Sequence, residues 1–189
     1  MRTGILGGTF DPIHLGHLAA ARAAMDCAGL DRVLFIPAAV PPHRPPTVAD
    51  AGDRLEMTRL AVEAEPGFEV SDFEIRRAGV SYTVDTLREL HRAYPHDELF
   101  LILGWDAAKL LSSWREPDEV RALASLIIVT RPGSGAPTAT SAIVCERATP
   151  DISGSDLRRR LARGQPVTDL LPAAVAEYVA GRGLYRHNR

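Results

Sequence analysis

Short apolar runs alternate with amphipathic segments along the 189-residue chain, and this alternation predicts strands and helices in turn. Runs of about six apolar residues are typical of strands buried on both faces of a parallel sheet. The strands predicted in this way are 3–8, 32–37, 68–72, 98–103, 125–130 and 141–146. The helices predicted from the spacing of apolar residues are 15–28, 53–64, 83–94, 153–163 and 172–181.

The order of these elements indicates the fold class. A strand, a helix and a strand follow one another within residues 3–37, and such a βαβ unit requires a parallel sheet. Gly29 is placed to end the first helix, Thr83 to cap a later one, and Pro117 to begin a short one. The chain shows no repeat and no linker. We therefore expect one α/β domain over 1–189, a doubly wound parallel sheet of the Rossmann-like type.

Composition excludes several classes of protein. With 46% hydrophobic and 24% charged residues the chain is globular, and its net charge of -2 argues against a generally basic nucleic-acid binder. The apolar runs are too short to span a membrane, and the N-terminus lacks the apolar core of a signal peptide. Cys27 and Cys145 lie far apart without CxxC spacing, so we expect no disulfide and no zinc site. A cytoplasmic protein fits these features.

The clearest candidate chemistry follows the first strand, in the segment GGTFDPIHLGH. Glycines such as Gly8 and Gly16 let the backbone approach a ligand, and the free N–H groups of the next helix suit a phosphate. His14 and His17 are three residues apart and share one helix face. Protonated, this pair would add positive charge for an anion; the plainer alternative is two surface histidines near a turn. The spacing differs from the GxGxxG dinucleotide motif.

Two further segments offer polar groups at the ends of elements. Gly104 and Asp106 follow the strand 98–103, where a carboxylate can hold a ribose, although Asp106 could equally cap a helix. In the late segment ISGSDLRRRL, Ser153 or Ser155 can cap a helix, and Arg158 follows within its first turn. A hydroxyl, free amides and a guanidinium at one helix start describe a second phosphate site.

Together, the early HLGH and the late ISGSDLR resemble the HxGH nucleotidyltransferase superfamily. A longer series of segments is similar to the bacterial nicotinate-nucleotide adenylyltransferase family over essentially the whole chain. In order, these are GGTFDPIHLGHL, IPAAVPPHRPP, GVSYTVDTLREL, ILGWDAAKLLSSW, TRPG, ISGSDLRRRLARG and LLPAAVAEYVAGRGLY. HLGH belongs to the superfamily, whereas PPHR, SYTVDTL and the GLY ending single out the family.

The resemblance implies adenylyl transfer from ATP to nicotinate mononucleotide, giving nicotinate adenine dinucleotide and pyrophosphate in NAD biosynthesis. It implies an ATP site of Gly8, Thr9, Phe10, His14, His17, Gly104, Asp106, Ile152, Ser155 and Arg158. Within that set, His14, His17 and Arg158 would be catalytic. Arg44, Thr83 and Trp114 would bind the mononucleotide, with the indole stacked on the nicotinate ring and backbone N–H groups receiving the carboxylate.

Magnesium should bridge the phosphates and be bound mainly through ATP, so we expect no set of protein ligands for it. Asp11 either contacts a metal-bound water or closes the turn after the first strand. Two positions depart from the family pattern. Ser155 stands where the family often has threonine, and Trp105 stands where it has a small or polar residue. Trp105 could pack under the ATP site, reshape the entrance, or be an ordinary core aromatic.

Other functions share parts of this pattern. The acceptor could be nicotinamide mononucleotide or another phosphorylated compound, as in a pantetheine-phosphate enzyme. A class I tRNA-synthetase fragment would need the lysines of a KMSKS-type motif, and Lys109 is the only lysine. A non-catalytic nucleotide sensor on the same fold is a further alternative. The sequence leaves the oligomeric state open.

Overall fold

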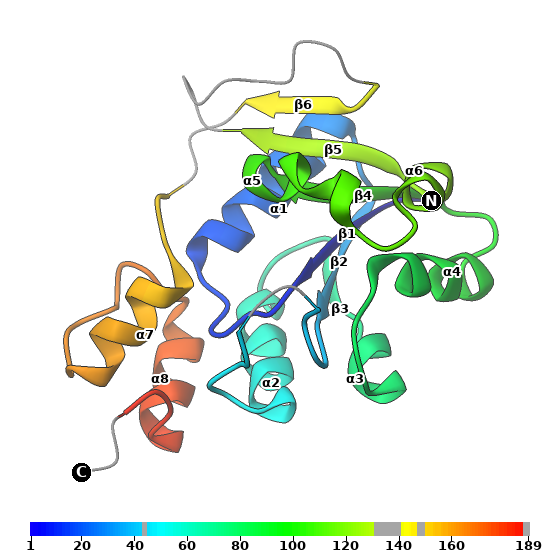
Figure 1. The fold of residues 1–189 in the computed structure, drawn as a ribbon. Helices are drawn as coiled ribbons and strands as arrows, with labels where there is room; N and C mark the ends of the chain where they lie inside the picture. Colours follow the sequence, from blue (N-terminus) through cyan, green and yellow to red (C-terminus); the bar gives the residue numbers. More distant parts are fainter. Residues whose placement is uncertain (43–44, 131–140, 147–149, 187–189) are drawn as a thin grey trace.

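The computed structural model describes residues 1–42, 45–130, 141–146 and 150–186. Its strands form one six-stranded sheet in the order β3-β2-β1-β4-β5-β6, and every neighbouring pair is parallel (Figure 1). They are β1 (Arg2–Gly8), β2 (Arg32–Pro37), β3 (Phe68–Val70), β4 (Glu98–Gly104), β5 (Ser125–Thr130) and β6 (Ile143–Glu146). The strand order reverses between β1 and β4, which marks the ligand-binding edge of a doubly wound sheet. The predicted fold class is confirmed.

Helices cover both faces of this sheet. They are α1 (Leu15–Ala28), α2 (Ala51–Val62), α3 (Phe73–Arg77), α4 (Thr83–Ala93), α5 (Trp105–Lys109), α6 (Pro117–Leu123), α7 (Gly154–Ala162) and α8 (Ala173–Arg182). A single 3-10 turn, η1 (Leu111–Ser113), separates α5 from α6 in this part of the chain. The helix α3 was not predicted, because the chain leaves β3 two residues before the expected end of that strand and turns at Ser71 and Asp72 into one short helix.

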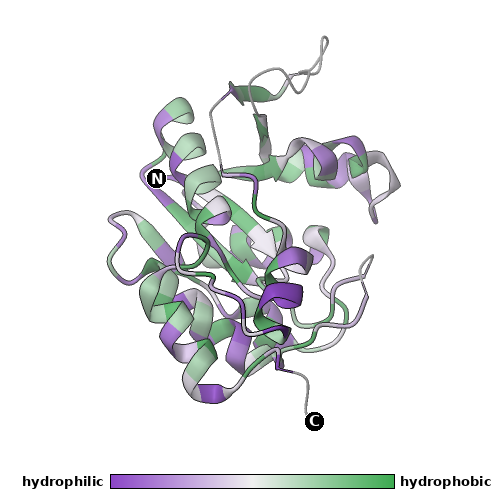
Figure 2. Cartoon of the chain, turned by 90° about the vertical axis from the view of Figure 1, so that its left-hand side faces the viewer, coloured by the Kyte–Doolittle hydropathy of each residue, from purple (hydrophilic) through white to green (hydrophobic). Residues whose placement is uncertain are grey.

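Two apolar cores lie on opposite faces of the sheet. On one face α1, α2, α7 and α8 pack side chains such as Met57 and Val175 against strand residues that include Phe35. On the other face α4 and α6 pack Leu87 and Val120 against strand residues that include Leu101. Figure 2 shows the strands as mostly hydrophobic and the helices as mixed, as expected for a sheet covered on both sides.

The helix ends follow the local sequence with two corrections. Gly29 ends α1 in the left-handed conformation, and Pro117 is the first residue of α6, as predicted. The helix α2 begins at Ala51, earlier than expected, because the Asp50 side chain accepts a hydrogen bond from the N–H of Asp53 at 2.7 Å. Thr83 does not cap α4: Tyr82 holds that position without a side-chain hydrogen bond, and Thr83 is the first helical residue.

Cys27 and Cys145 form a disulfide, with their Cα atoms 6.0 Å apart. The expectation of no disulfide was wrong, because α1 packs against the edge strand β6 and brings together residues that are 118 positions apart. Among the described residues, no helix is long and apolar enough to cross a membrane. The cytoplasmic location stays a prediction.

Candidate active site

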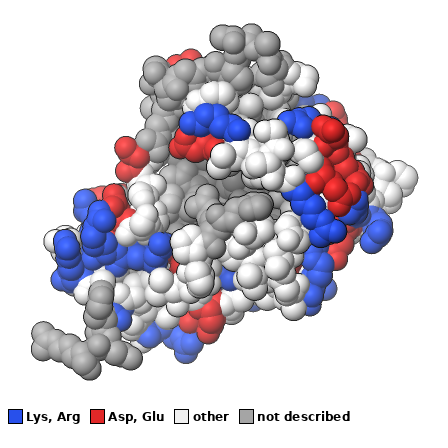
Figure 3. Space-filling view, viewed as in Figure 1, with Lys and Arg blue, Asp and Glu red and all other residues white. Residues whose placement is uncertain are grey.

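A cavity of about 980 Å³ opens at the carboxyl ends of the strands, beside the switch between β1 and β4. Its wall includes Gly8 at the end of β1, Thr9 directly after it, Ala38 after β2, and Gly104 at the end of β4. Figure 3 shows the molecule hollowed on this face, with basic side chains gathered over α7 on one side of the hollow. The polar segments predicted from the sequence therefore meet at one edge of the sheet.

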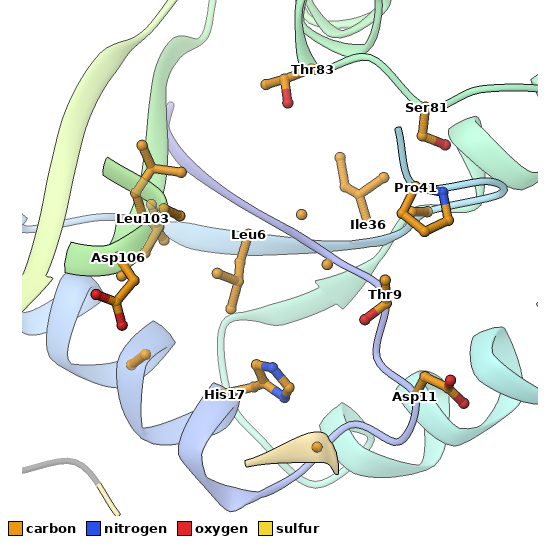
Figure 4. A pocket seen from close by; sticks show the side chains of 18 of the residues that line it. Leu6, Thr9, Asp11, His17, Ile36, Pro41, Ser81, Thr83, Leu103 and Asp106 are labelled. Atoms are coloured by element: carbon orange, nitrogen blue, oxygen red, sulfur yellow. The ribbon is translucent and has the colours of Figure 1, made fainter. Parts of the chain in front are cut away.

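The two histidines form the start of α1. His14 is the residue before the first helical one, and its N–H donates to Nδ1 of His17 at 3.2 Å. The rings stack with centroids 3.7 Å apart, and the edge of Phe10 supports His17 at 5.1 Å. Because Nδ1 of His17 is an acceptor, the proton of the neutral ring is on Nε2. Figure 4 shows this ring pointing into the cavity.

His14 is neutral at physiological pH, so this ring does not supply the positive charge that a protonated pair would add. Its side chain is buried, and burial lowers its pKa to about 4. Its Nδ1 atom is buried and has no hydrogen-bond partner among the described residues, although the ring is part of the cavity wall. Buried polar atoms are normally paired, so this nitrogen is a candidate contact for a ligand.

Arg158 reaches the same region from the first turns of α7. Its Nη1 donates to the backbone oxygen of Asp11 at 2.7 Å, and lies 3.9 Å from Oδ2 of the same residue. The Asp11 carboxylate accepts hydrogen bonds from the N–H groups of Val48 and Ala49 and from the Tyr185 hydroxyl. Of the two roles expected for Asp11, the structure supports closing the turn.

On the β4 side, Gly104 precedes α5 and Asp106 lies within its first turn, so the alternative that Asp106 caps this helix is wrong. The Asp106 carboxylate pairs with Nζ of Lys109 at 2.7 Å, and its side chain is 96% exposed. The ammonium lies 5.7 Å from the centroid of the Trp105 ring. Trp105 is half-buried and part of the cavity wall, so it is not an ordinary core aromatic.

Most of the predicted site residues line this one cavity. They are Gly8, Thr9, His14, His17, Thr83, Gly104, Asp106, Trp114, Ile152, Ser155 and Arg158. Phe10 is different: it is 1% exposed and lies in the core beneath His17. A Cβ atom on Gly8 would lie 2.9 Å from the Phe10 ring, which is why a glycine fits there. Arg44 lies outside the described residues.

The hydroxyl expected to cap α7 does not do so. Ser153 precedes the helix without a side-chain capping bond, and its Oγ lies 3.0 Å from Oγ of Ser155. Both hydroxyls are exposed and both residues line the cavity. These groups are therefore placed to contact a ligand at the N-terminus of α7, beside Arg158.

The sequence interpretation missed Arg54, a fully buried guanidinium beneath the site. It donates to the backbone oxygen of Thr9 at 2.7 Å and to that of Ala39 at 3.1 Å, joining the loops after β1 and β2. Burial lowers its pKa, and the nearby Asp11 partly offsets this effect. The sequence feature that could have revealed Arg54 is its spacing of three residues from Met57, which places it on the buried face of α2.

Arg115 was also missed, although it follows Trp114 directly. Its guanidinium lies 4.8 Å from the centroid of the Tyr82 ring, and both residues line the cavity. Carboxylates at 3.6 Å (Asp85) and 3.3 Å (Glu116) hold it there. An indole, a phenol and a guanidinium thus form one part of the wall, which suits a planar, negatively charged group.

Fold and site together define a nucleotidyltransferase. The family model described as cytidylyltransferase-like matches residues 5–160. The chain belongs to the nicotinate-nucleotide adenylyltransferase family. It is 49% identical to a protein of Thermus thermophilus named as a probable member, over 98% of this chain and 100% of that one. A probable member from Corynebacterium kroppenstedtii is 44% identical over 97% and 90% of the two chains.

Solved structures share the fold. The nicotinic acid mononucleotide adenylyltransferase of Plasmodium falciparum, complexed with NaAD, matches with a TM-score of 0.83 and 17% identity, over 99% and 98% of the two chains. A putative nicotinate-nucleotide adenylyltransferase of Vibrio parahaemolyticus matches with a TM-score of 0.75 and 18% identity, over 100% and 98%. At these identities the likeness extends to the arrangement of the sheet and its helices.

Proposed function

We propose that the protein transfers the adenylyl group of ATP to nicotinate mononucleotide. A phosphate oxygen of the mononucleotide forms a bond to the α-phosphorus of ATP. The bond from that phosphorus to the oxygen bridging to the β-phosphate breaks, and pyrophosphate leaves. The acceptor is already an anion, so the protein needs to supply alignment and charge stabilisation rather than a nucleophile. Membership of the family, with His17 and Trp114 in the wall of one cavity, carries this proposal.

The triphosphate is assigned to the part of the cavity where α1 and α7 begin. The N-terminal N–H groups of both helices favour an anion, and α1 has no acidic residue in its first turn to oppose it. His17 donates from Nε2 and Arg158 adds a full positive charge. The neutral ring of His14 supplies a hydrogen-bonding nitrogen at the same point. The role of these groups is to hold the phosphates and to stabilise the departing pyrophosphate.

The mononucleotide is assigned to the opposite part, around Trp114, Tyr82 and Thr83. The Trp114 indole is half-buried and offers a face on which a pyridine ring can stack. Arg115 beside it favours a carboxylate over a neutral amide, although Asp85 and Glu116 screen part of its charge. We therefore place the acid ahead of nicotinamide mononucleotide as the acceptor.

Magnesium enters with ATP in this proposal, as the MgATP substrate. Within residues 1–42, 45–130, 141–146 and 150–186, no group of three His, Cys, Asp or Glu side chains could hold a metal ion. Asp11 is occupied by the hydrogen bonds that close its turn. Mg²⁺ often keeps several waters and binds through substrate phosphates, which supports a metal carried by the nucleotide.

Pyrophosphate release from MgATP tests the function. It should depend on an added acceptor and be fastest with nicotinate mononucleotide, slower with nicotinamide mononucleotide and absent with phosphopantetheine. Faster turnover with the amide would make nicotinamide mononucleotide the preferred acceptor. If the protein binds ATP but releases no pyrophosphate with any of the three acceptors, it is a nucleotide sensor, and the enzymatic assignment is overturned.

A further inference from the structure

A buried carboxylate, Glu74 of α3, lies in the wall of the cavity on the side assigned to the mononucleotide. It is 7% exposed, and its Oε1 accepts a hydrogen bond from the Thr86 hydroxyl at 2.6 Å. The Ser81 hydroxyl also acts on this carboxylate and favours its ionised form. An acidic group facing the site of an anionic substrate costs affinity, so its presence there needs a reason.

Glu74 lies at the centre of a hydrogen-bond network in which the donors on both sides point toward its carboxylate. The N–H of Ala39 donates to Oγ of Ser81 at 2.9 Å, and Arg77 donates to Oγ1 of Thr86 at 3.1 Å. The Thr86 hydroxyl accepts on one side and gives its proton to the carboxylate on the other. The Ser81 hydroxyl accepts from Ala39 and has its own proton to offer to the same carboxylate. An ionised carboxylate can only accept, so it orients both hydroxyl hydrogens toward itself.

The two hydroxyls flank Tyr82 and Thr83, where α4 begins at the cavity. The same segment meets the loop after β2, because the N–H of Ser81 donates to the backbone oxygen of Val40 at 2.9 Å. A β-bridge between Val40 and Val80 adds to this contact. Figure 4 shows Ser81 and Thr83 across the cavity from His17, with Pro41 beside Ser81. Glu74 thus lies where the loop after β2 meets the segment between α3 and α4.

We propose that Glu74 is a positioning residue for the mononucleotide, fixing the start of α4 and the loop after β2 through Ser81 and Thr86. The inference rests on the proposed function, because it assumes that the mononucleotide occupies this side. Its effect is on the acceptor and not on ATP, whose phosphates are assigned to α1 and α7 at the other side. Burial raises the pKa of Glu74, while the two hydroxyls and Arg77 favour the ionised form that the network requires.

Steady-state kinetics with each substrate varied separately tests the role. Glu74→Ala should raise the KM for nicotinate mononucleotide at least tenfold and leave the KM for ATP within twofold. Glu74→Gln keeps one acceptor oxygen and should raise the acceptor KM by about threefold. The matched control is Glu89→Gln, since Glu89 also pairs with Arg77, at 2.9 Å, but lies outside the cavity wall. It should leave both KM values unchanged.

Equal increases in both KM values, or none, in a folded Glu74→Ala protein would overturn the positioning role. A lower acceptor KM in Glu74→Gln would also overturn it, because the carboxylate would then act only as a repelling charge. If Glu74→Ala does not fold, Ser81→Ala and Thr86→Val each remove one arm of the network. Either should raise the acceptor KM severalfold and spare ATP. Wild type that does not use nicotinate mononucleotide would instead refute the proposed function, so the two failures are distinguishable.

Discussion

The backbone N–H of His14 donates to Nδ1 of His17 at 3.2 Å, and the two imidazole rings stack 3.7 Å apart. This contact fixes the ring of His17 and leaves Nε2 as its proton-bearing nitrogen. It also satisfies one of the N–H groups that a helix leaves unpaired at its start. One side chain therefore both completes the N-terminus of α1 and presents a donor to the cavity.

We predict that His17→Ala lowers kcat/KM at least about 100-fold, which corresponds to about 2.7 kcal/mol of transition-state stabilisation. The ring is assigned to hydrogen-bond a phosphate oxygen as charge moves to pyrophosphate. Steady-state kinetics with circular dichroism to verify folding is the measurement. The control is His96→Ala, an exposed histidine in the turn before β4, which should retain full activity. Activity of His17→Ala within a few-fold of wild type would refute the assignment.

The buried ring of His14 gives a pH-dependent stability with a definite sign. Its pKa is about 4 when folded and 6.5 when exposed, so the unfolded chain binds the extra proton between these values. Stability from this group is complete above pH 6.5 and is lost as the pH falls toward 4. The loss amounts to about 3 kcal/mol.

His14→Asn removes this titration, so its free energy of unfolding should fall less steeply than that of wild type from pH 6.5 to 4. Denaturant unfolding at several pH values measures the difference. Carboxylates that titrate near pH 4 are common to both proteins and cancel in the comparison. Parallel pH profiles would show that His14 is not buried as a neutral ring.

Trp114→Ala should raise the KM for the mononucleotide more than that for ATP, because the indole is assigned to stack on the nicotinate ring. The loss of one aromatic stacking contact is expected to cost about 1 kcal/mol or more, or at least about fivefold in KM. Trp105→Ala is the matched control, since Trp105 lies in the cavity wall on the β4 side. Equal increases in both KM values for Trp114→Ala would argue against ring stacking.

Arg54→Met should lower the free energy of unfolding by about 2–4 kcal/mol, because the backbone oxygens of Thr9 and Ala39 lose their buried donor. The control on the same helix is Arg59→Met. Arg59 is half-exposed, and its ion pair with Glu56, at 3.7 Å, is a weak surface contact. Its loss should therefore change the free energy of unfolding by less than about 0.5 kcal/mol. Urea denaturation compares the two. Similar stabilities for both variants would mean that Arg54 does not hold the two loops.

The sequence predicted the sheet and most of its helices because local signals were strong. The buried runs such as 98–103 have few alternatives to a central strand, and Gly29 marks a helix end by its left-handed backbone. Local signals were weak for α3, which spans only five residues between β3 and the segment that leads to α4. A helix this short has too few residues for a periodic pattern.

The sequence predicted the site residues that follow strands. It missed the site residues that lie on the buried faces of helices. His17 and Arg158 were found because they lie near the starts of helices at the sheet edge. Arg54 and Glu74 act from within buried faces, where the sequence shows only a charge at a core position. The pKa of His14 could not be predicted either, since it depends on burial by elements that are distant in the chain.

The Cys27–Cys145 disulfide gives the last prediction, since it closes a loop of more than 100 residues. Such a crosslink restricts the unfolded chain, and its loss should lower the free energy of unfolding by about 2–4 kcal/mol. Reduced wild type and Cys27→Ser should unfold at the same denaturant concentration, which should be lower than that of oxidised wild type. Reductant should shift this midpoint for wild type and leave it unchanged for Cys27→Ser. Two titratable thiols in the air-oxidised protein would contradict the bond. Because Cys27 lies at the far end of α1 from His17, kcat/KM of the folded protein should stay within about twofold in either redox state.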